Sequence, residues 1–391
     1  MLGIIIESVT TILALCGLGF YFAALWSARD FVRRKRPEAT TFYPPVSILK
    51  PLKGFDHDMY GSFVSHCRQQ YAGEYELLFG VSSADDPAVA AVEQLKAEFP
   101  ESLIRLILTP EVLGANGKVG NLAQMVPQAK GDYLVINDSD IKVSPHYLAR
   151  VMAPFADERV GMVTALYRGR SHRTVGSKME ALGISTDFAA GVLTARKIEG
   201  GIRFGLGSTL AMPRAALDAI GGLTPLADYL ADDYELGARI AAKGYRVELI
   251  DEVVETTVPA YRFGQFLEHQ LRWARGMRDA RKLGYLGVVF TFGLPWALLN
   301  VIAAGASLSS LALLSLVLAA RVTLALAVGV GVLRDAQVLR DLWLLPLRDM
   351  VALAVWAWSY AGNTVAWRGK KFTLRDGKLL RISGADDRSG M

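Results

Sequence analysis

The most constraining feature of this sequence is a short apolar run that stops abruptly in carboxylates. Tyr133–Ile136 has the composition of a strand covered on both faces of a sheet, and Asp138 and Asp140 follow at once. Ligands in an open α/β sheet bind just beyond the carboxyl ends of the strands. Two acids at this spacing can offer hard oxygen ligands to Mg²⁺ or Mn²⁺, which commonly bridge them to substrate phosphates. The motif is short, and a polar turn that caps the next element explains it equally well when it stands alone.

The residues on either side of this run alternate between strand and helix patterns. The expected strands are 46–50, 76–81, 103–108, 133–136 and 210–213, and the expected helices are 58–70, 88–98 and 118–126. Such alternation predicts a mostly parallel α/β sheet with helices on both faces. Asp85 and Asp86 follow the second strand. We therefore expect them at the same edge of the sheet as Asp138 and Asp140, around one shared ligand.

Two further segments of this central region carry candidate site residues. Asp232 and Asp233 begin a predicted helix that runs to about Lys243, where acids suit the positive end of the helix dipole. The functional alternative is that one of them projects into the cleft as a proton acceptor. Gly205 and Gly207 lie in a tight segment before the strand at 210–213. They either let the main chain approach a ligand or are plain turn residues.

Apolar segments at both ends of the chain predict a membrane protein. Hydrophobic residues make up 52% of the 391 residues and the mean hydropathy is +0.27. Residues 2–26 carry Glu7 as their only charge, a length that suits a spanning helix. A basic cluster follows this segment, at Arg29, Arg33, Arg34, Lys35 and Arg36. Positive charge after the apolar run favours a cytoplasmic location for the cluster and disfavours a cleaved signal peptide.

The C-terminal third is apolar enough for two to three spans. The run after Lys282 carries only Arg321 before Leu333, which is long enough for two helices of roughly 20 residues. A charge in mid-span is costly in lipid, so we expect Arg321 to face other helices or a polar cavity. Residues 342–367 form a further apolar segment, interrupted by Arg348 and Asp349, and a basic tail follows. Three spans would place that tail outside, whereas its charge favours the cytoplasm, so one segment is re-entrant or interfacial.

The remaining composition excludes several classes of protein. A net charge of +5 is modest for this length and does not indicate a nucleic-acid partner. Two cysteines give no disulfide framework, and no zinc-ligand spacing is present. Residues 264–282 form a basic amphipathic pattern, typical of a helix in the membrane interface whose arginines meet headgroups or phosphates. A solvated basic face is the alternative.

These patterns divide the chain into six segments. They are an N-terminal transmembrane helix (1–28), a basic linker (29–45), an α/β catalytic domain (46–263), an interfacial helix (264–284), a C-terminal transmembrane region (285–367) and a basic tail (368–391).

Taken together, the motifs resemble glycosyltransferase family 21, the ceramide glucosyltransferases, and the arrangement is similar to the wider family 2 membrane transferases. The resemblance covers essentially the whole chain. Besides the N-terminal anchor and the hydrophobic C-terminal third, it rests on the segments 48–54, 85–87, 118–122, 138–140 and 231–234. It implies a GT-A-type, Rossmann-like nucleotide-diphospho-sugar transferase domain in the cytoplasm, joined to transmembrane helices.

The resemblance also implies roles for individual residues. Asp85 or Asp86 would contact the uridine end of a UDP-sugar, and Asp138 and Asp140 would hold a divalent cation, Mg²⁺ or Mn²⁺, at the diphosphate. Asp233 would be the general base, with Asp232 beside it. The remaining substrate-binding residues would be Lys118, Asn121, His269, Arg272 and Trp273.

The matches at the end of the domain are incomplete. Arg272 and Trp273 match the family's (Gln/Arg)-x-x-Arg-Trp motif, whereas His269 takes the place of Gln or Arg. Asp187 stands where animal ceramide glucosyltransferases carry a functional His.

The activity implied is inverting transfer of glucose or N-acetylglucosamine from a UDP-sugar to a lipid alcohol, most of all ceramide. The protein would be a multi-pass protein of the bacterial inner membrane. Similar bacterial enzymes modify hopanoids with N-acetylglucosamine, and diacylglycerol also presents an alcohol at the interface. The patterns are also compatible with a processive polysaccharide synthase and with a non-catalytic nucleotide-sugar-binding membrane protein.

Overall fold

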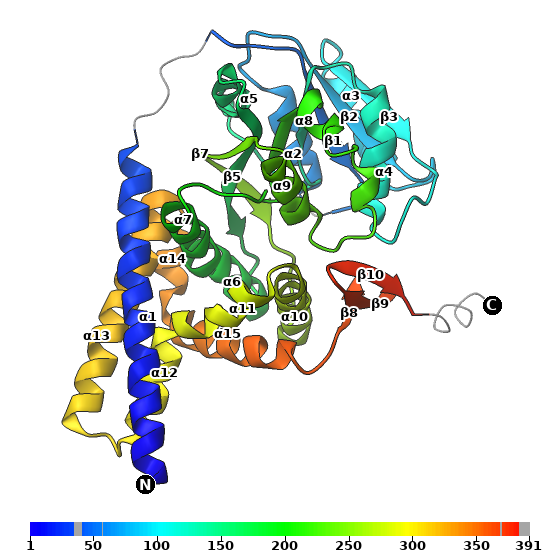
Figure 1. Ribbon diagram of the computed structural model, residues 1–391. Coiled ribbons are helices and arrows are strands. Elements are labelled where there is room, and N and C mark those ends of the chain that lie inside the picture. Colours follow the sequence, from blue (N-terminus) through cyan, green and yellow to red (C-terminus); the bar gives the residue numbers. More distant parts are fainter. Residues whose placement is uncertain (35–40, 57, 368–369, 383–391) are drawn as a thin grey trace.

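The structure is a computed structural model that describes residues 1–34, 41–56, 58–367 and 370–382. The predicted basic residues Lys35 and Arg36, part of the predicted linker, and positions 368–369 and 383–391 of the predicted tail lie outside the described residues. An α/β domain lies at one end of the molecule, and a narrow arm of long helices extends from it (Figure 1).

The domain is built on a seven-stranded sheet whose order is β3-β2-β1-β4-β6-β5-β7. Its strands are β1 (Val46–Pro51), β2 (Tyr75–Val81), β3 (Leu103–Leu108), β4 (Tyr133–Ile136), β5 (Val160–Arg170), β6 (Leu210–Pro213) and β7 (Arg246–Thr257). Of these, β6 alone runs against its neighbours. The predicted parallel-dominated sheet is confirmed. The chain moves outward from β1 to β3 and then returns to place β4 on the other side of β1. This is a topological switch point, where such sheets bind ligands.

Alternating apolar residues give the sheet two covered faces. Ile48 belongs to a core with helices α2 (Met59–Cys67), α3 (Ala88–Glu98) and α5 (Tyr147–Met152). Its neighbour Leu49 belongs to the core on the opposite face. The helices there are α4 (Gly117–Met125), α8 (Arg214–Asp218) and α9 (Asp232–Ala242). Successive strand residues point to opposite faces, so the continuous apolar composition of these strands follows from burial on both sides.

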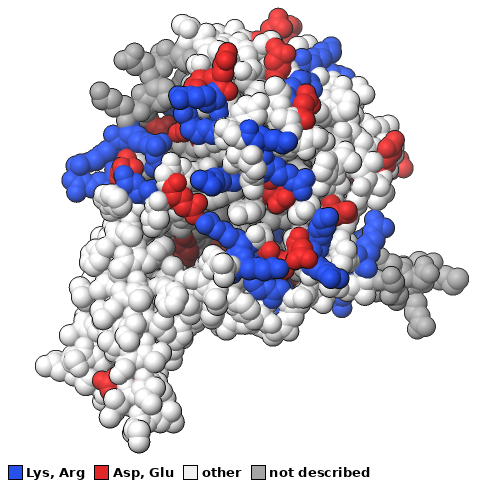
Figure 2. All heavy atoms as spheres, viewed as in Figure 1, with Lys and Arg blue, Asp and Glu red and all other residues white. Residues whose placement is uncertain are grey.

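The arm consists of α1 (Leu2–Arg33), α12 (Gly293–Ala303) and α13 (Leu308–Ala325), which continues as a π-helical segment, η6 (Leu326–Val332) (Figure 1). In the view of Figure 2 the arm carries almost no charge, whereas basic and acidic side chains gather on the domain. Among the described residues, two helices are long and apolar enough to span a membrane, Leu2–Arg33 and Leu308–Val332. The pair Lys282–Thr291 and Gly293–Ala303, bent by 53°, makes a third if it counts as one span.

Small residues and side-chain hydrogen bonds hold the arm together. A Cβ added to Gly17 of α1 would lie 2.2 Å from the Cα of Gly293, so the two backbones touch at this crossing. Asn300 of α12 donates to the hydroxyls of Thr11 (2.8 Å) and Thr10 (3.1 Å) on α1. Close approach of this kind is how helices pack in lipid, where the hydrophobic effect does not drive association.

Several elements connect the arm and the domain. Helix α6 (Val175–Gly183), a π-helical segment η3 (Ile184–Phe188) and α7 (Ala189–Ile198) lead from β5 toward the arm, and α7 packs along α1. Helix α10 (Phe263–Ala280) lies below α9, and α11 (Lys282–Gly287), α14 (Gln337–Asp341) and α15 (Leu345–Ser359) follow later in the chain.

The described part of the predicted basic tail is structured. Strands β8 (Thr364–Trp367), β9 (Lys370–Arg375) and β10 (Lys378–Arg381) form a small antiparallel sheet beside the domain (Figure 1). The predicted apolar segment 342–367 yields only the 15 residues of α15 as regular helix. Because α12 leaves the domain and α13 returns to it, α15 and the terminal sheet lie on the domain side of the arm.

Candidate active site

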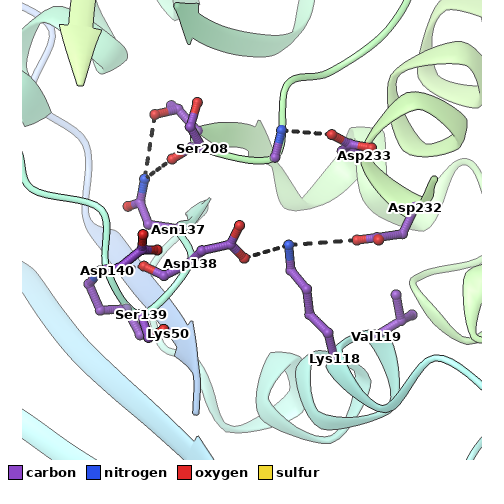
Figure 3. A network of polar contacts seen from close by, with 12 residues as sticks. Lys50, Lys118, Val119, Asn137, Asp138, Ser139, Asp140, Ser208, Asp232 and Asp233 are labelled. Atoms are coloured by element: carbon purple, nitrogen blue, oxygen red, sulfur yellow. Dashed lines mark hydrogen bonds and ion pairs between the residues drawn. The ribbon is translucent and has the colours of Figure 1, made fainter. Parts of the chain in front are cut away.

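The predicted site residues Asp138, Lys118 and Asp232 meet beyond the end of β4. The Lys118 Nζ lies 2.6 Å from Asp138 Oδ1 and 3.9 Å from Asp232 Oδ2 (Figure 3). Burial alone would lower the pKa of the Lys118 ammonium, but the two carboxylates raise it above its ordinary value. Lys118 is therefore a fixed positive charge between two acids that are far apart in sequence.

Asn116 sets the position of Lys118. Its side chain caps α4, accepting from the backbone N–H groups of Lys118 (3.1 Å) and Val119 (3.2 Å). Its amide donates to the carbonyl of Tyr229 (2.8 Å) and to Asp232 Oδ1 (3.2 Å). One buried asparagine thus joins the first turn of α4 to the chain that leads into α9.

Asp233 faces the same hollow as Asp138. Its carboxylate accepts from the backbone N–H groups of Gly207 (Oδ2, 2.8 Å) and Tyr234 (Oδ1, 2.8 Å). A Cβ added to Gly207 would lie 3.1 Å from Asp233 Oδ2 and 3.8 Å from Asp138 Oδ2, so a side chain there would fill the space between the two acids. Burial, and then the neighbouring Asp232, raise the pKa of Asp233 to about 6. A carboxyl group of that pKa can take up a proton near neutral pH.

Asp140 is held differently from Asp138. Its Oδ2 accepts from the Thr256 hydroxyl (2.5 Å) and the Thr257 backbone N–H (3.2 Å), and burial raises its pKa above the ordinary value. The side chain of Asp138 is 41% exposed and faces the hollow. Behind them, the buried Lys50 donates to the Asp138 carbonyl (2.9 Å), and burial lowers the pKa of Lys50 to about 7.

This donor set fits a hard divalent cation that completes its shell from outside the protein. Asp138 and Asp140, separated by one residue, offer carboxylate oxygen ligands. Gly207 has no side chain, which leaves space beside Asp138. Among the described residues, no group of three or more His, Cys, Asp and Glu side chains is placed to hold a metal. A cation at Asp138 and Asp140 would take its other ligands from phosphate and water, as Mg²⁺ commonly does.

Three other predicted residues lie around strand β2, which β1 separates from β4. Asp85 is exposed beyond its end. Asp86 accepts from the backbone N–H groups of Gly54 (3.0 Å) and Ala88 (2.9 Å), so it holds the loop after β1 against the start of α3. Asn121 is 7% exposed and donates to the Gly80 carbonyl (2.7 Å). Asn121 thus binds the end of β2, and its predicted contact with substrate stays a prediction.

Helix α10 presents its predicted residues within a run of aromatic rings. His269 stacks on Tyr261 (5.3 Å between ring centroids) and contacts Trp273 (5.5 Å), which in turn contacts Phe188 (6.1 Å). Phe188 packs on Tyr167 at 5.3 Å.

The aromatic run lies within electrostatic range of the acidic hollow. The pKa of the Tyr167 hydroxyl is raised first by burial and then by Asp233, and the pKa of Tyr261 is raised by burial and influenced by Arg272 and Asp140. Through Phe188, the aromatic run joins Trp273 of the motif at 269–273 to Tyr167 on β5.

A buried ionic cluster lies beneath this aromatic run. Arg321, 2% exposed, donates to Asp349 (2.8 Å from both Nε and Nη2) and also binds Asp187. Arg348 lies 3.5 Å from Asp187 and donates to Gln270 (3.2 Å). The prediction that Arg321 would face other helices is confirmed.

Some residues of the site gave no functional signal in the sequence. Lys50 lies within the motif at 48–54 and Asn116 just before the one at 118–122. Their partners in the site, Asp138 and Asp232, are more than 80 residues away. Asn before Gly-Lys is a recognisable helix cap, which could have marked Asn116 as the start of α4. Nothing in the local pattern indicates that Thr256 binds Asp140.

Comparisons with known proteins show the family of this chain. The family model described as Glycosyl transferase family 21 matches residues 9–380. Ceramide glucosyltransferase 3 of Caenorhabditis elegans is 27% identical over 275 residues, which is 68% of this chain and 59% of that protein. Beta-monoglucosyldiacylglycerol synthase of Synechocystis sp. is 26% identical over 268 residues, 66% of this chain and 53% of that protein. The chain thus spans a little over half the length of these curated relatives.

A solved structure shares the fold. The mannosyltransferase PcManGT from Pyrobaculum calidifontis, in complex with GDP-Man and Mn²⁺, superposes with a TM-score of 0.58 at 19% identity, covering 91% of this chain and 98% of that one. The domain therefore has the GT-A fold, as predicted. Since the family model matches nearly the whole chain, this protein belongs to glycosyl transferase family 21.

Proposed function

We propose that the protein transfers a hexose from a UDP-sugar to the hydroxyl group of a membrane lipid, with inversion at the anomeric carbon. The observation that carries the proposal is the convergence of Lys118, Asp138, Asp232 and Asp233 beside Gly207, at the switch point of the sheet. These acids come from two elements that are almost a hundred residues apart, and a purely structural role gives no reason for them to share one hollow.

The donor's diphosphate would lie at Asp138 and Lys118. A divalent cation bound by Asp138 and Asp140 would neutralise charge on the leaving diphosphate as a Lewis acid. Lys118 is already a partly buried ammonium at this point, and Arg272 on α10 can donate to the phosphates. Of the two residues predicted for the uridine end, Asp85 is the better candidate. It is exposed beyond β2, whereas Asp86 accepts hydrogen bonds from the backbone of Gly54 and Ala88.

Asp233 would act as the general base. As the acceptor oxygen forms its bond to the anomeric carbon, the bond from that carbon to the diphosphate oxygen breaks and UDP leaves with the electron pair. The acceptor's proton passes to Asp233. A base of this kind contributes on the order of 10²–10⁴-fold to the rate. One base on the face opposite the leaving group is sufficient for a single displacement with inversion.

The acceptor would be a two-chain lipid alcohol such as ceramide. The arm places the domain beside a bilayer, so a lipid could keep its tails in the membrane while its hydroxyl reaches the cleft. The relatives are named for ceramide and for diacylglycerol, which share an alcohol at the interface. Holding donor and acceptor in one cleft lowers the entropic barrier to transfer. The basic residues at the C-terminal end of α1 support a cytoplasmic domain on a bacterial inner membrane.

Transport of a nucleotide-sugar and synthesis of a polysaccharide receive less support from the structure. Arg321 and Arg348 are occupied by Asp349, Asp187 and Gln270, so they line no free polar path for transport. A synthase that extrudes a polysaccharide favours more spans than the two or three found in the described chain. Analysis of the reaction products separates both functions from the transfer of a single sugar.

The proposal is tested by a matrix of donors and acceptors. The full-length protein in lipid nanodiscs is given UDP-glucose or UDP-N-acetylglucosamine with ceramide, diacylglycerol or a hopanoid polyol, and products are identified by mass spectrometry. We expect one glucose on ceramide and no product from the Asp233→Asn variant. Products bearing several sugars would favour a synthase. No product with any pair, despite measurable UDP binding, would contradict the proposal.

A further inference from the structure

We infer that the C-terminal sheet β8–β10 is a positioning element for the catalytic aspartates. This inference rests on the proposed function, because it requires Asp232 and Asp233 to act in transfer. The sheet has its own small core of Val365, Phe372, Leu374 and Leu379, so it is a folded unit. Partly buried against that core are Leu230 and Ala115, each close in sequence to a residue of the acidic site.

The sheet is hydrogen-bonded to the segment that leads into α9. The Leu230 N–H donates to the carbonyl of Gly377 (3.0 Å), and the Leu379 N–H donates to the carbonyl of Asp228 (2.7 Å). Tyr229 lies between these two bonds, forms a β-bridge with Lys378 and has the Lys378 ammonium 5.4 Å from its ring centroid. This segment ends two residues before Asp232.

The opposite side of the same segment is held by the start of α4. The Asn116 N–H donates to the carbonyl of Ala227 (2.7 Å), and the Ala115 N–H donates to Asp228 Oδ1 (2.9 Å). Asn116 is also the residue that caps Lys118 and binds Asp232. Residues 227–230 are therefore fixed between the helix that carries Lys118 and the C-terminal sheet.

Helix α10 anchors the sheet. Arg275 donates to the carbonyl of Thr364, Arg278 donates to the carbonyl of Gly362 (3.1 Å) and to Asn363 Oδ1 (2.6 Å), and Asp279 accepts from the N–H of Gly377. These residues lie one to two turns beyond Arg272 on the same helix.

The segment before α9 also touches α10 directly. A Cβ added to Gly276 would lie 3.3 Å from the Leu230 side chain. Gly276 is four residues after Arg272 and so lies on the same side of the helix. The sheet thus links α10, which carries Arg272 and Trp273, to the segment that leads into α9, the helix of Asp233.

Hydrogen bonds and the contact of Leu230 join the C-terminal sheet to the segment before α9. A cavity of about 220 Å³ lies between the turn at Asp376 and Gly377, the residues around Tyr229 and Tyr234, and the end of α10. The hydrogen bonds of Gly377 and Leu379 and the contact with Leu230 hold the segment before α9 in place. Loss of one of them should shift Asp233 relative to the donor site rather than unfold the domain.

The test is an Asp279→Ala variant of the full-length protein, which leaves the Gly377 N–H without its acceptor. We expect kcat to fall at least tenfold, while KM for UDP-glucose, the Kd for UDP and the melting temperature stay within twofold or a few degrees of the parent. Asp279→Asn keeps an acceptor oxygen and should restore most of kcat. The matched control is Asp376→Asn, whose exposed pair with Lys282 (3.1 Å) should be dispensable.

A second variant perturbs the same contact from the sheet. Gly377 has φ +79°, and a Cβ there would lie 3.2 Å from the Tyr229 ring, so Gly377→Val should displace Tyr229 and lower kcat in the same way. Unchanged kcat in both variants, or a loss that only tracks the folded fraction, would overturn the inference. Failure of the parent protein to transfer sugar would instead overturn the proposed function.

Discussion

At the scale of single residues, the site separates its acids by environment. Asp138 is partly exposed and paired with Lys118, Asp140 is fixed by Thr256, and Asp233 lies in a hollow that raises its pKa. In the proposed mechanism these aspartates therefore have different tasks, Asp138 and Asp140 at the diphosphate and Asp233 at the acceptor. Pairs of titratable groups whose pKa values are pushed apart commonly mark acid–base assignments.

The pKa of Asp233 predicts an acid limit to activity. A base acts only when ionised, and burial raises the pKa of this carboxyl to about 6, so kcat should be level above that pH and fall about tenfold per unit below it. The measurement is kcat against pH from 4.5 to 8 with saturating donor and acceptor. A profile that stays level down to pH 4.5 would remove Asp233 from this role.

Asp140→Ala should weaken metal dependence and nucleotide binding together. Its carboxylate is one of two expected cation ligands, so its loss should raise the metal concentration for half-maximal activity and the Kd for UDP, each at least tenfold. The first quantity is measured by titrating activity with the metal, and the second by titrating the protein with UDP. Asp132→Ala, at the exposed opposite end of the same strand, is the control and should behave as the parent. An unchanged metal titration in Asp140→Ala would exclude it as a ligand.

At the scale of elements, the parallel part of the fold is predictable because its patterns are local. Each strand from β1 to β4 is a short apolar run followed by turn residues, and each helix between them shows its own periodicity. The C-terminal sheet carried a local signal as well. Phe372 and Leu374 alternate with polar residues, and Asp376-Gly377 is a strong hairpin turn signal, but the basic charge of the segment obscured it.

The acids of the site were predictable from strand and helix ends, whereas their supports were not. Asp138 follows a strand and Asp233 begins a helix, and both positions are visible in sequence. Asn116 and Gly207 act on acids 116 and 26 residues away, so only the folded chain reveals them. The prediction of two to three C-terminal spans stays a prediction: among the described residues, Leu308–Val332 is one C-terminal candidate and the bent pair Lys282–Thr291 and Gly293–Ala303 is a second if it counts as one span.

The Arg321 cluster predicts a stability effect at the junction of arm and domain. Arg321→Gln would leave Asp349 and Asp187 without their main partner, and removing one member of a buried ion pair costs about 3–5 kcal/mol. We expect a clear fall in the melting temperature in detergent. Arg159→Gln is the matched control, because its pair with Asp157 is exposed and contributes little to stability. Equal melting temperatures of the two variants would contradict a structural role for the cluster.

At the scale of the whole molecule, the terminal sheet bears on the predicted topology. It contacts residues 228–230 of the domain, so the end of the described chain lies on the side where α13 rejoins the domain. The N-terminus lies at the far end of the arm (Figure 1). The tension between a basic C-terminus and an odd number of C-terminal spans therefore disappears if α15 lies along the interface.

Reporter fusions in a bacterial host test this topology. Green fluorescent protein at the C-terminus should fluoresce, whereas alkaline phosphatase at that position should be inactive. Phosphatase inserted at Ala306, in the turn between α12 and α13, should be active. An active C-terminal phosphatase would mean that α15 crosses the membrane.

The measurement that tests the central claim most directly compares donor binding and transfer in Asp233→Asn. If one hollow holds the nucleotide at Asp138 and Lys118 and takes the acceptor's proton at Asp233, the variant should bind UDP with the parent's Kd while kcat falls by about 10²–10⁴-fold. Transfer at the parental rate would contradict the account.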